Sequence, residues 1–361
     1  MLKNKGKISI KQVMILFILT SYNPAVRFIP NYTTQKAKQA AWLAPLVTFI
    51  IYLALIYMYS LLFKKYKNKN FADIVSGITS KFWGKLVLII YLLYFTLALG
   101  GYLRYYSEIL VGSVYPNVEI NIFIIVMLFL LAIVVKSGIT VIARMTDIIF
   151  IILSFILMSY MVLMIPSIKI DYITPISSLD IVPILKASVG TTALKYLPVM
   201  FLFSDKWSRT NEFFKQGIKA CLYLFVLDTF IIITCIGTLG ASLTARTPLA
   251  FFISVKNISL LGVLVGFESA LTAIMIVTDF ILMVVFLYSA MAMIKSLVNL
   301  KDHTPLINIY LVTIYLLGWL VAENFFELEA LVYELLVYVK ITILVILPII
   351  IFIIGKIRKK I

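Results

Sequence analysis

Apolar runs of about 20 residues recur along the whole chain, and short polar connections that carry most of the charges separate them. A run of that length crosses the hydrocarbon core of a bilayer as one helix. The pattern therefore predicts an all-α polytopic membrane protein with ten transmembrane helices. Their approximate bounds are 11–32, 41–63, 84–112, 120–137, 146–166, 188–205, 219–241, 267–297, 304–322 and 330–355.

The first and sixth spans carry polar and helix-breaking residues in their middle. The first is interrupted at 20–24 (Thr-Ser-Tyr-Asn-Pro), and the sixth has Gly-Thr-Thr at 190–192 followed by Lys195 and Pro198. Proline removes a backbone N–H, and backbone groups freed at membrane depth must be buried in protein or line a wet cavity. Broken spans in matching positions of two halves favour a binding site between them. We therefore predict broken helices 1 and 6.

The composition supports the membrane assignment. Of the 361 residues, 63% are hydrophobic and 13% are charged, whereas soluble domains are about 45–50% apolar. A bundle of spans behaves as one unit, so we expect residues 1–361 to form a single integral membrane domain. Its two repeats are expected at about 11–166 and 188–355.

The formal net charge of +16 does not indicate nucleic-acid binding, because the basic residues follow the topology of the spans. Most of the 32 lysines and arginines fall in the termini and in connections on one side, as the positive-inside rule requires. Both termini are therefore predicted to be cytoplasmic, next to anionic membrane lipids. The basic residues predicted outside are Lys36, Lys38, Lys169, Lys186, Arg246 and Lys256.

Two connections are long enough to be structured. Residues 64–85 alternate lysines with apolar residues, which predicts an amphipathic helix on the inner leaflet. Residues 242–266 predict an outer helical lid. A simple surface loop is the alternative for both.

Charged residues inside the spans are costly and therefore informative. Arg104 and Glu108 are four residues apart on one face of the third span, so they form either an internal ion pair or a gate or proton relay. Asp228 and Asp279 lie near mid-depth without a local partner. Either could accept a bond from Lys195 or be kept neutral by desolvation.

Lys195 is the most suggestive of these residues, because it lies in the broken sixth span, three residues before Pro198. It could bind a substrate carboxylate or pair with Asp228 or Asp279. The candidate ligand-binding residues are Ser21, Tyr22, Asn23, Tyr102, Thr191 and Lys195. The candidate ion or proton relay residues are Arg104, Glu108, Asp228 and Asp279.

Glu334 and Lys340 in the tenth span are six residues apart and do not share a helix face. Each is expected to find a partner on another helix. The sequence has no nucleophile–base set and no phosphate-binding loop, and its one histidine is in a polar connection. We therefore predict no enzyme activity, no metal and no cofactor.

Several short segments resemble the spore germination permease family, the B subunits of GerA-type germinant receptors within the amino acid–polyamine–organocation superfamily. They are Ile8–Gln12 before span one, Ala41–Ala44 opening span two, Gly138 with Ile142–Arg144 before span five, and Phe267–Ser269 entering span eight. Their order along the chain, rather than any one motif, carries the resemblance.

The resemblance implies a LeuT-like fold of two inverted five-helix repeats, with a germinant held between spans one and six. It implies an amino acid, sugar or nucleoside as germinant. An A-type membrane subunit and a C-type lipoprotein are implied as partners in the inner membrane of the spore. Family members usually have a glycine in the break of span one, which lets a ligand carboxylate approach bare backbone, whereas this chain has Ser21–Pro24, in which Tyr22 and Asn23 add bulk and donors. A proton- or sodium-coupled amino acid transporter of the same fold is the alternative.

Overall fold

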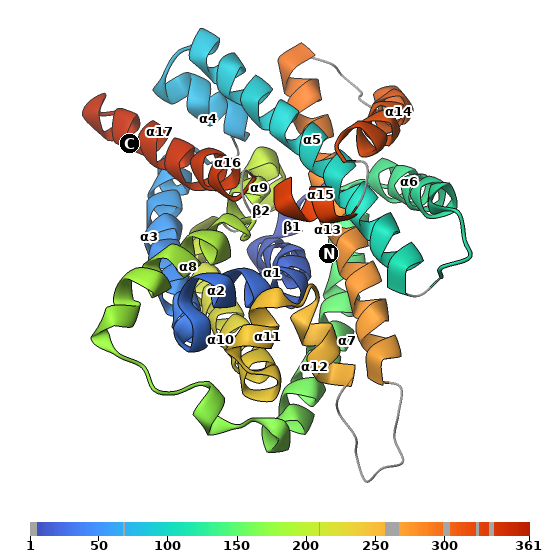
Figure 1. Ribbon diagram of the computed structural model, residues 1–361. Coiled ribbons are helices and arrows are strands. Elements are labelled where there is room, and N and C mark those ends of the chain that lie inside the picture. Colours follow the sequence, from blue (N-terminus) through green and yellow to red (C-terminus); the bar gives the residue numbers. More distant parts are fainter. Residues whose placement is uncertain are drawn as a thin grey trace.

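The computed structural model describes residues 6–67, 69–113, 115–208, 210–256, 267–298, 304–322, 325–331 and 336–361, and these are mostly helical (Figure 1). The first half contains α1 (Ile10–Arg27), α2 (Ile29–Ala37), α3 (Ala44–Lys65), α4 (Phe71–Ile78), α5 (Lys81–Ser113), α6 (Ile120–Lys136) and α7 (Ile139–Met164). The second half contains α8 (Ile181–Ala193), α9 (Leu197–Met200), α10 (Phe213–Leu239), α11 (Ala241–Arg246), α12 (Ala250–Lys256), α13 (Phe267–Val298), α14 (Thr304–Leu320), α15 (Phe325–Leu331), α16 (Val337–Ile341) and α17 (Leu347–Ile357).

The helices lie where the apolar runs predict them. Among the described residues, six helical stretches are long and apolar enough to cross a membrane, and α6 and α14 are shorter apolar helices. The six stretches are Ile29–Lys65, Lys81–Gly112, Ile139–Ser167, Thr210–Leu239, Ser269–Val298 and Val337–Ile357. Ten crossings in two repeats remain a prediction.

Helix α1 lies near the middle of the bundle, where α7, α10 and α13 pack against it (Figure 1). Residues 13–34 are all buried, which is typical of a helix enclosed by protein on every side. By contrast, large apolar side chains on the outer helices, such as Ile151 and Phe155 of α7, are exposed. The molecule therefore buries its first helix and presents apolar side chains outward, as a protein in lipid does.

The predicted break at 20–24 is wrong in its position. Helix α1 continues through Pro24 to Arg27, and α2 begins at Ile29. The hydroxyls of Thr20 and Ser21 donate to the carbonyl of Phe17 within the same helix, at 2.9 and 2.8 Å. Proline removes only one donor from the helix, and packing on all sides holds the segment helical despite that loss.

In the sixth span, α8 ends at Ala193 and α9 begins at Leu197. Leu194, Lys195 and Tyr196 form a gap between them, which we call the 194–196 gap. Gly190 and the threonines at 191 and 192 belong to α8. Pro198 lies in the first turn of α9, where a helix does not need the missing N–H.

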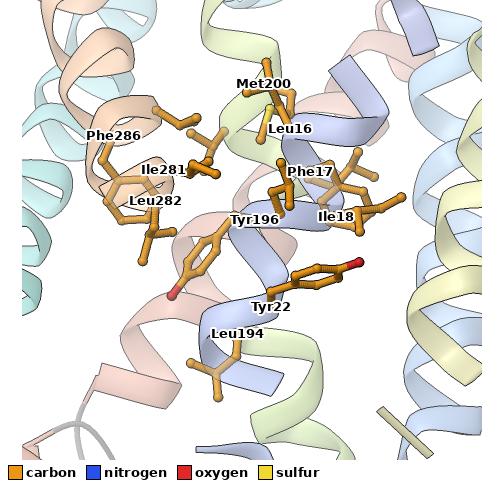
Figure 2. Close-up of a cluster of buried hydrophobic side chains, with 14 of the residues drawn as sticks. Leu16, Phe17, Ile18, Tyr22, Leu194, Tyr196, Met200, Ile281, Leu282 and Phe286 are labelled. Carbon is orange, nitrogen blue, oxygen red and sulfur yellow. The ribbon is translucent and has the colours of Figure 1, made fainter. Parts of the chain in front are cut away.

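The 194–196 gap packs against α1 and α13 through an apolar cluster. Figure 2 shows Tyr196 and Met200 in one cluster with Phe17 of α1 and Phe286 of α13, and Leu194 at the lower end of the view. The rings of Tyr196 and Phe286 meet edge to face, with centroids 5.0 Å apart. The hydroxyls of Tyr22 and Tyr196 point in opposite directions (Figure 2), so these two tyrosines serve different polar clusters.

A short parallel β-pair joins the N-terminus to the segment that follows α9. Strand β1 (Ile8–Ser9) pairs with β2 (Trp207–Ser208), with Ile8 opposite Trp207. Ser9 also caps α1, because its side chain accepts from the backbone N–H of Gln12 while the Gln12 side chain accepts from the Ser9 N–H. The start of α1 is thus bonded to the end of the sixth span.

The predicted amphipathic helix within 64–85 is present as α4 (Phe71–Ile78), and its place on the inner leaflet remains a prediction. Phe71, Ile74, Val75 and Ile78 are buried, and α4 packs against α5. Its apolar side is therefore covered by protein. In the predicted outer lid, α11 and α12 extend to Lys256, and residues 257–266 lie outside the described residues.

Close packing of α2 on α8 depends on Gly190. A Cβ at this position would overlap the ring of Tyr32. We expect Gly190→Ala to destabilise the protein by about 1–3 kcal/mol through overpacking. Thermal unfolding in detergent measures this, with Gly101→Ala as control, because its nearest neighbour would be 3.9 Å away. Equal midpoints for the two variants would contradict close packing at Gly190.

Candidate functional site

Two buried ion pairs connect the central helices. The first joins α1 to α13, where Arg27 Nη2 lies 2.6 Å from Asp279 Oδ2 and Nη1 donates to Oδ1 at 3.0 Å. The two side chains are 2% and 1% exposed. Asn23, one turn before Arg27, also donates to Asp279 Oδ1. Asp279 is therefore held by two side chains from one face of α1.

Arg27 is a functional candidate that the sequence interpretation missed. A signal for it exists, because Arg27 is a charged residue inside the first apolar run, as Arg104 is in the third. The prediction that Asp279 has no local partner holds along its own helix. The partner comes from α1, far away in the sequence.

The second pair joins the 194–196 gap to α10. Lys195 Nζ lies 2.7 Å from Asp228 Oδ2 and donates to Oδ1 at 2.9 Å, and the side chains are 3% and 2% exposed. Pairing of Lys195 with Asp228, one of the alternatives left open by the sequence, is confirmed. Both residues border a space of about 10 Å³, which is about the size of one water molecule.

Helix α3 supplies donors to the backbone freed near the gap. The hydroxyl of Tyr52 lies 2.7 Å from the carbonyl oxygen of Lys195 and 3.1 Å from that of Thr192. The hydroxyl of Thr48 bonds to the hydroxyls of Thr191 and Thr192. Protein groups rather than lipid thus satisfy the interrupted helix, as a bilayer requires.

Tyr102 of α5, Tyr196 of the gap and Lys340 of α16 form a third cluster. The two tyrosine hydroxyls bond to each other, and Lys340 Nζ donates to the Tyr102 hydroxyl at 3.4 Å. Nζ also lies 5.4 and 6.0 Å from the centroids of the two rings. Lys340 is 3% exposed. Glu334, the other charged residue of the tenth span, lies outside the described residues.

Tyr22 belongs to a fourth cluster on the opposite side of α1. Its hydroxyl bonds to the hydroxyl of Ser154 on α7 at 2.8 Å and to that of Tyr223 on α10. The Tyr223 hydroxyl donates to Ser154 at 3.0 Å. This cluster joins three helices through hydroxyl groups alone.

Arg104 and Glu108 form the predicted ion pair, with Nη2 2.6 Å from Oε1. The Arg104 guanidinium also lies 4.5 Å from the ring centroid of Trp319 on α14. The pairing is confirmed, and a role for it as a gate or relay remains a prediction.

The six candidate ligand-binding residues thus bond to neighbouring protein groups. Lys195 is in the gap and Thr191 is near the end of α8, Tyr102 contacts the gap from α5, and Ser21, Tyr22 and Asn23 are on α1. Over the described part of the chain, their hydrogen bonds place them in separate polar clusters around the centre of the bundle. Among the described residues, no three His, Cys, Asp or Glu side chains gather as a metal site.

Comparison with protein families gives a match over most of the chain. Residues 7–326 match the family described as spore germination protein. The chain is 24% identical to spore germination protein KB of Bacillus subtilis (strain 168), over 99% of this chain and 96% of that protein.

Solved structures of transporters share the fold. Mhp1, a nucleobase-cation-symport-1 family transporter in a closed conformation with bromovinylhydantoin bound, aligns with a TM-score of 0.71 at 12% identity, over 97% of this chain and 78% of Mhp1. An Eremococcus coleocola manganese transporter mutant gives 0.62 at 12% identity, over 94% and 77% of the two chains. MhsT in complex with L-phenylalanine gives 0.62 at 11% identity, over 92% and 87%. With its long apolar helices, the chain is an integral membrane protein with the fold of these transporters.

Proposed function

Because the chain belongs to the family of spore germination proteins, we propose that it is the germinant-sensing membrane subunit of a spore nutrient germinant receptor. It binds a small polar molecule, an amino acid, sugar or nucleoside, between α1 and the α8–α9 segment. The family match over residues 7–326 is the observation that carries this proposal. Family proteins of this kind are membrane germination proteins and not enzymes.

The buried charges support a ligand site at the 194–196 gap. Lys195 and Asp228 neutralise each other across two helices, and Tyr52 binds the carbonyl of Lys195 itself. A ligand carboxylate or hydroxyl that replaces Asp228 at the Lys195 ammonium would separate α10 from the gap. Ser21, Tyr22, Asn23, Tyr102 and Thr191 then supply the remaining polar contacts.

Binding shifts the protein between two packings of its central helices, and partner subunits respond to the change. We place both termini in the cytoplasm and the ten spans, in inverted repeats at 11–166 and 188–355, in the inner membrane of the spore. The partners are an A-type membrane subunit and a C-type lipoprotein. The basic connections on the cytoplasmic side favour this orientation.

A coupled amino acid transporter is the second candidate, and the fold shared with Mhp1 and MhsT favours it. In that case Arg104, Glu108, Asp228 and Asp279 would relay the coupling proton or ion. The two candidates differ in whether solute crosses the bilayer.

A nutrient screen tests the proposal. Spores that lack this protein should fail to germinate with one class of nutrient and recover when the gene is restored, and proteoliposomes that contain the purified protein should take up none of that nutrient. Unchanged germination with every nutrient, together with gradient-driven uptake, would contradict the sensor proposal and favour a transporter.

A further inference from the structure

A cavity of about 530 Å³ lies between α5, α14, α15 and α16, and Phe28 and Tyr105 separate it from Arg27. This volume is in the range of about 300–1,000 Å³ that is usual for small-molecule sites. Its walls are mainly aliphatic, with Leu93, Leu97, Leu317, Leu320, Leu336 and Ile343 among them. Leu320 is 79% exposed and Leu93 and Leu97 are also exposed, so the cavity opens on the apolar outer side of the bundle.

One basic side chain lines this cavity. Lys340 and Tyr102 both line it, and the Lys340 ammonium is buried there against the Tyr102 hydroxyl. Over the part of the chain that the structure describes, no carboxylate lies within 4.0 Å of Lys340 Nζ. A buried ammonium that meets only tyrosine groups is incompletely neutralised, because desolvation of a charge is costly without an anion.

The backbone beside Lys340 is also irregular. A π-helix covers Thr342–Ile346 directly after α16, and Ile343, which lines the cavity, accepts a hydrogen bond from the Tyr91 hydroxyl at 2.7 Å. Single π-helical turns are frequently found at functional sites. Side-chain charge, cavity and backbone irregularity thus coincide at one place.

We propose that this cavity binds an amphiphile with an apolar chain and a carboxylate, which enters from the bilayer and pairs with Lys340. The aliphatic walls suit the chain, and the ammonium suits the carboxylate. A phospholipid is a poorer occupant, because its headgroup stays at the membrane surface whereas Lys340 contacts Tyr196 at the centre of the bundle. Lys340 donates to Tyr102, and Tyr102 bonds to Tyr196, the residue next to Lys195. A carboxylate at Lys340 is thereby connected to the 194–196 gap.

Binding of radiolabelled dodecanoate to the full chain in phosphatidylcholine nanodiscs tests this directly. We expect saturable binding that Lys340→Met weakens at least tenfold and that Ala98→Phe, which fills the cavity, also weakens. Lys340→Arg and the exposed control Lys186→Met should keep the affinity within about twofold. Dodecanoate should raise the thermal midpoint of the wild type and leave that of Lys340→Met unchanged. A cooperative unfolding transition in Lys340→Met shows that the variant is folded.

Three results would overturn the proposal. The first is absence of saturable binding in the wild type, and the second is equal affinity of the wild type and Lys340→Met. The third is equal competition by 1-dodecanol, which lacks the charge, or by phosphatidylglycerol in the disc, which would make the occupant a phospholipid. These assays use no germinant, so their failure leaves the proposed sensing function untouched.

Discussion

Replacement of Asp279 by alanine is expected to destabilise the protein by about 3–5 kcal/mol, because it leaves a buried guanidinium without its carboxylate. Arg27 and Asp279 are almost fully buried, and the two terminal guanidinium nitrogens, Nη1 and Nη2, face the carboxylate. Asn23 would lose its acceptor at the same time. Denaturation of purified protein in detergent, together with protein levels in membranes, measures the effect.

An exposed ion pair in the same chain provides the control. Lys206 and Asp205 are 3.3 Å apart and 41% and 34% exposed, and surface pairs of this kind contribute about 0–1 kcal/mol. Asp205→Ala should therefore change stability little. The double variant Arg27→Met with Asp279→Leu should recover most of the stability that Asp279→Ala loses. A double variant as unstable as Asp279→Ala would show that the unpaired charge is not the cause.

The second large effect is expected at Lys195 and Asp228. Each single variant, Lys195→Met or Asp228→Leu, leaves one buried charge and should cost about 3–5 kcal/mol. The double variant removes both charges and should restore the protein level. It should still respond poorly to the germinant, because the proposed ligand contact of Lys195 is gone.

Germination dose–response curves of spores with matched protein levels separate these effects. We expect the double variant to need at least tenfold more germinant, and Lys186→Met, which removes an exposed lysine of α8, to behave as wild type. A dose–response identical to wild type in the double variant would remove Lys195 from the ligand site.

Hydropathy was sufficient to locate the helices, because each long apolar run must either cross the membrane or be buried. Local spacing was sufficient for Arg104 and Glu108, since residues four apart on a helix always share a face. These predictions need no knowledge of how the helices pack. They hold because the relevant partners are close in the sequence.

Contacts between distant helices could not be chosen from the sequence. Lys195 had two possible carboxylate partners, and only the packing of α10 against the gap selects Asp228. Tyr52 has no feature that marks it, among the 21 tyrosines of the chain, as the donor to the carbonyl of Lys195. Pro24 was misleading because its effect on the backbone is local, whereas the surrounding helices determine whether the segment stays helical.

The backbone pairing of Ile8 with Trp207 has a consequence for any movement of the sixth span. Trp207 is fully buried and its ring stacks on that of Phe213. A rotation of the segment from α9 to β2 must therefore also displace the first turn of α1. The amino end of the chain then moves together with the sixth span. A bulky fusion placed directly before Ile8 would hinder this coupled movement, whereas one at the carboxyl end would not.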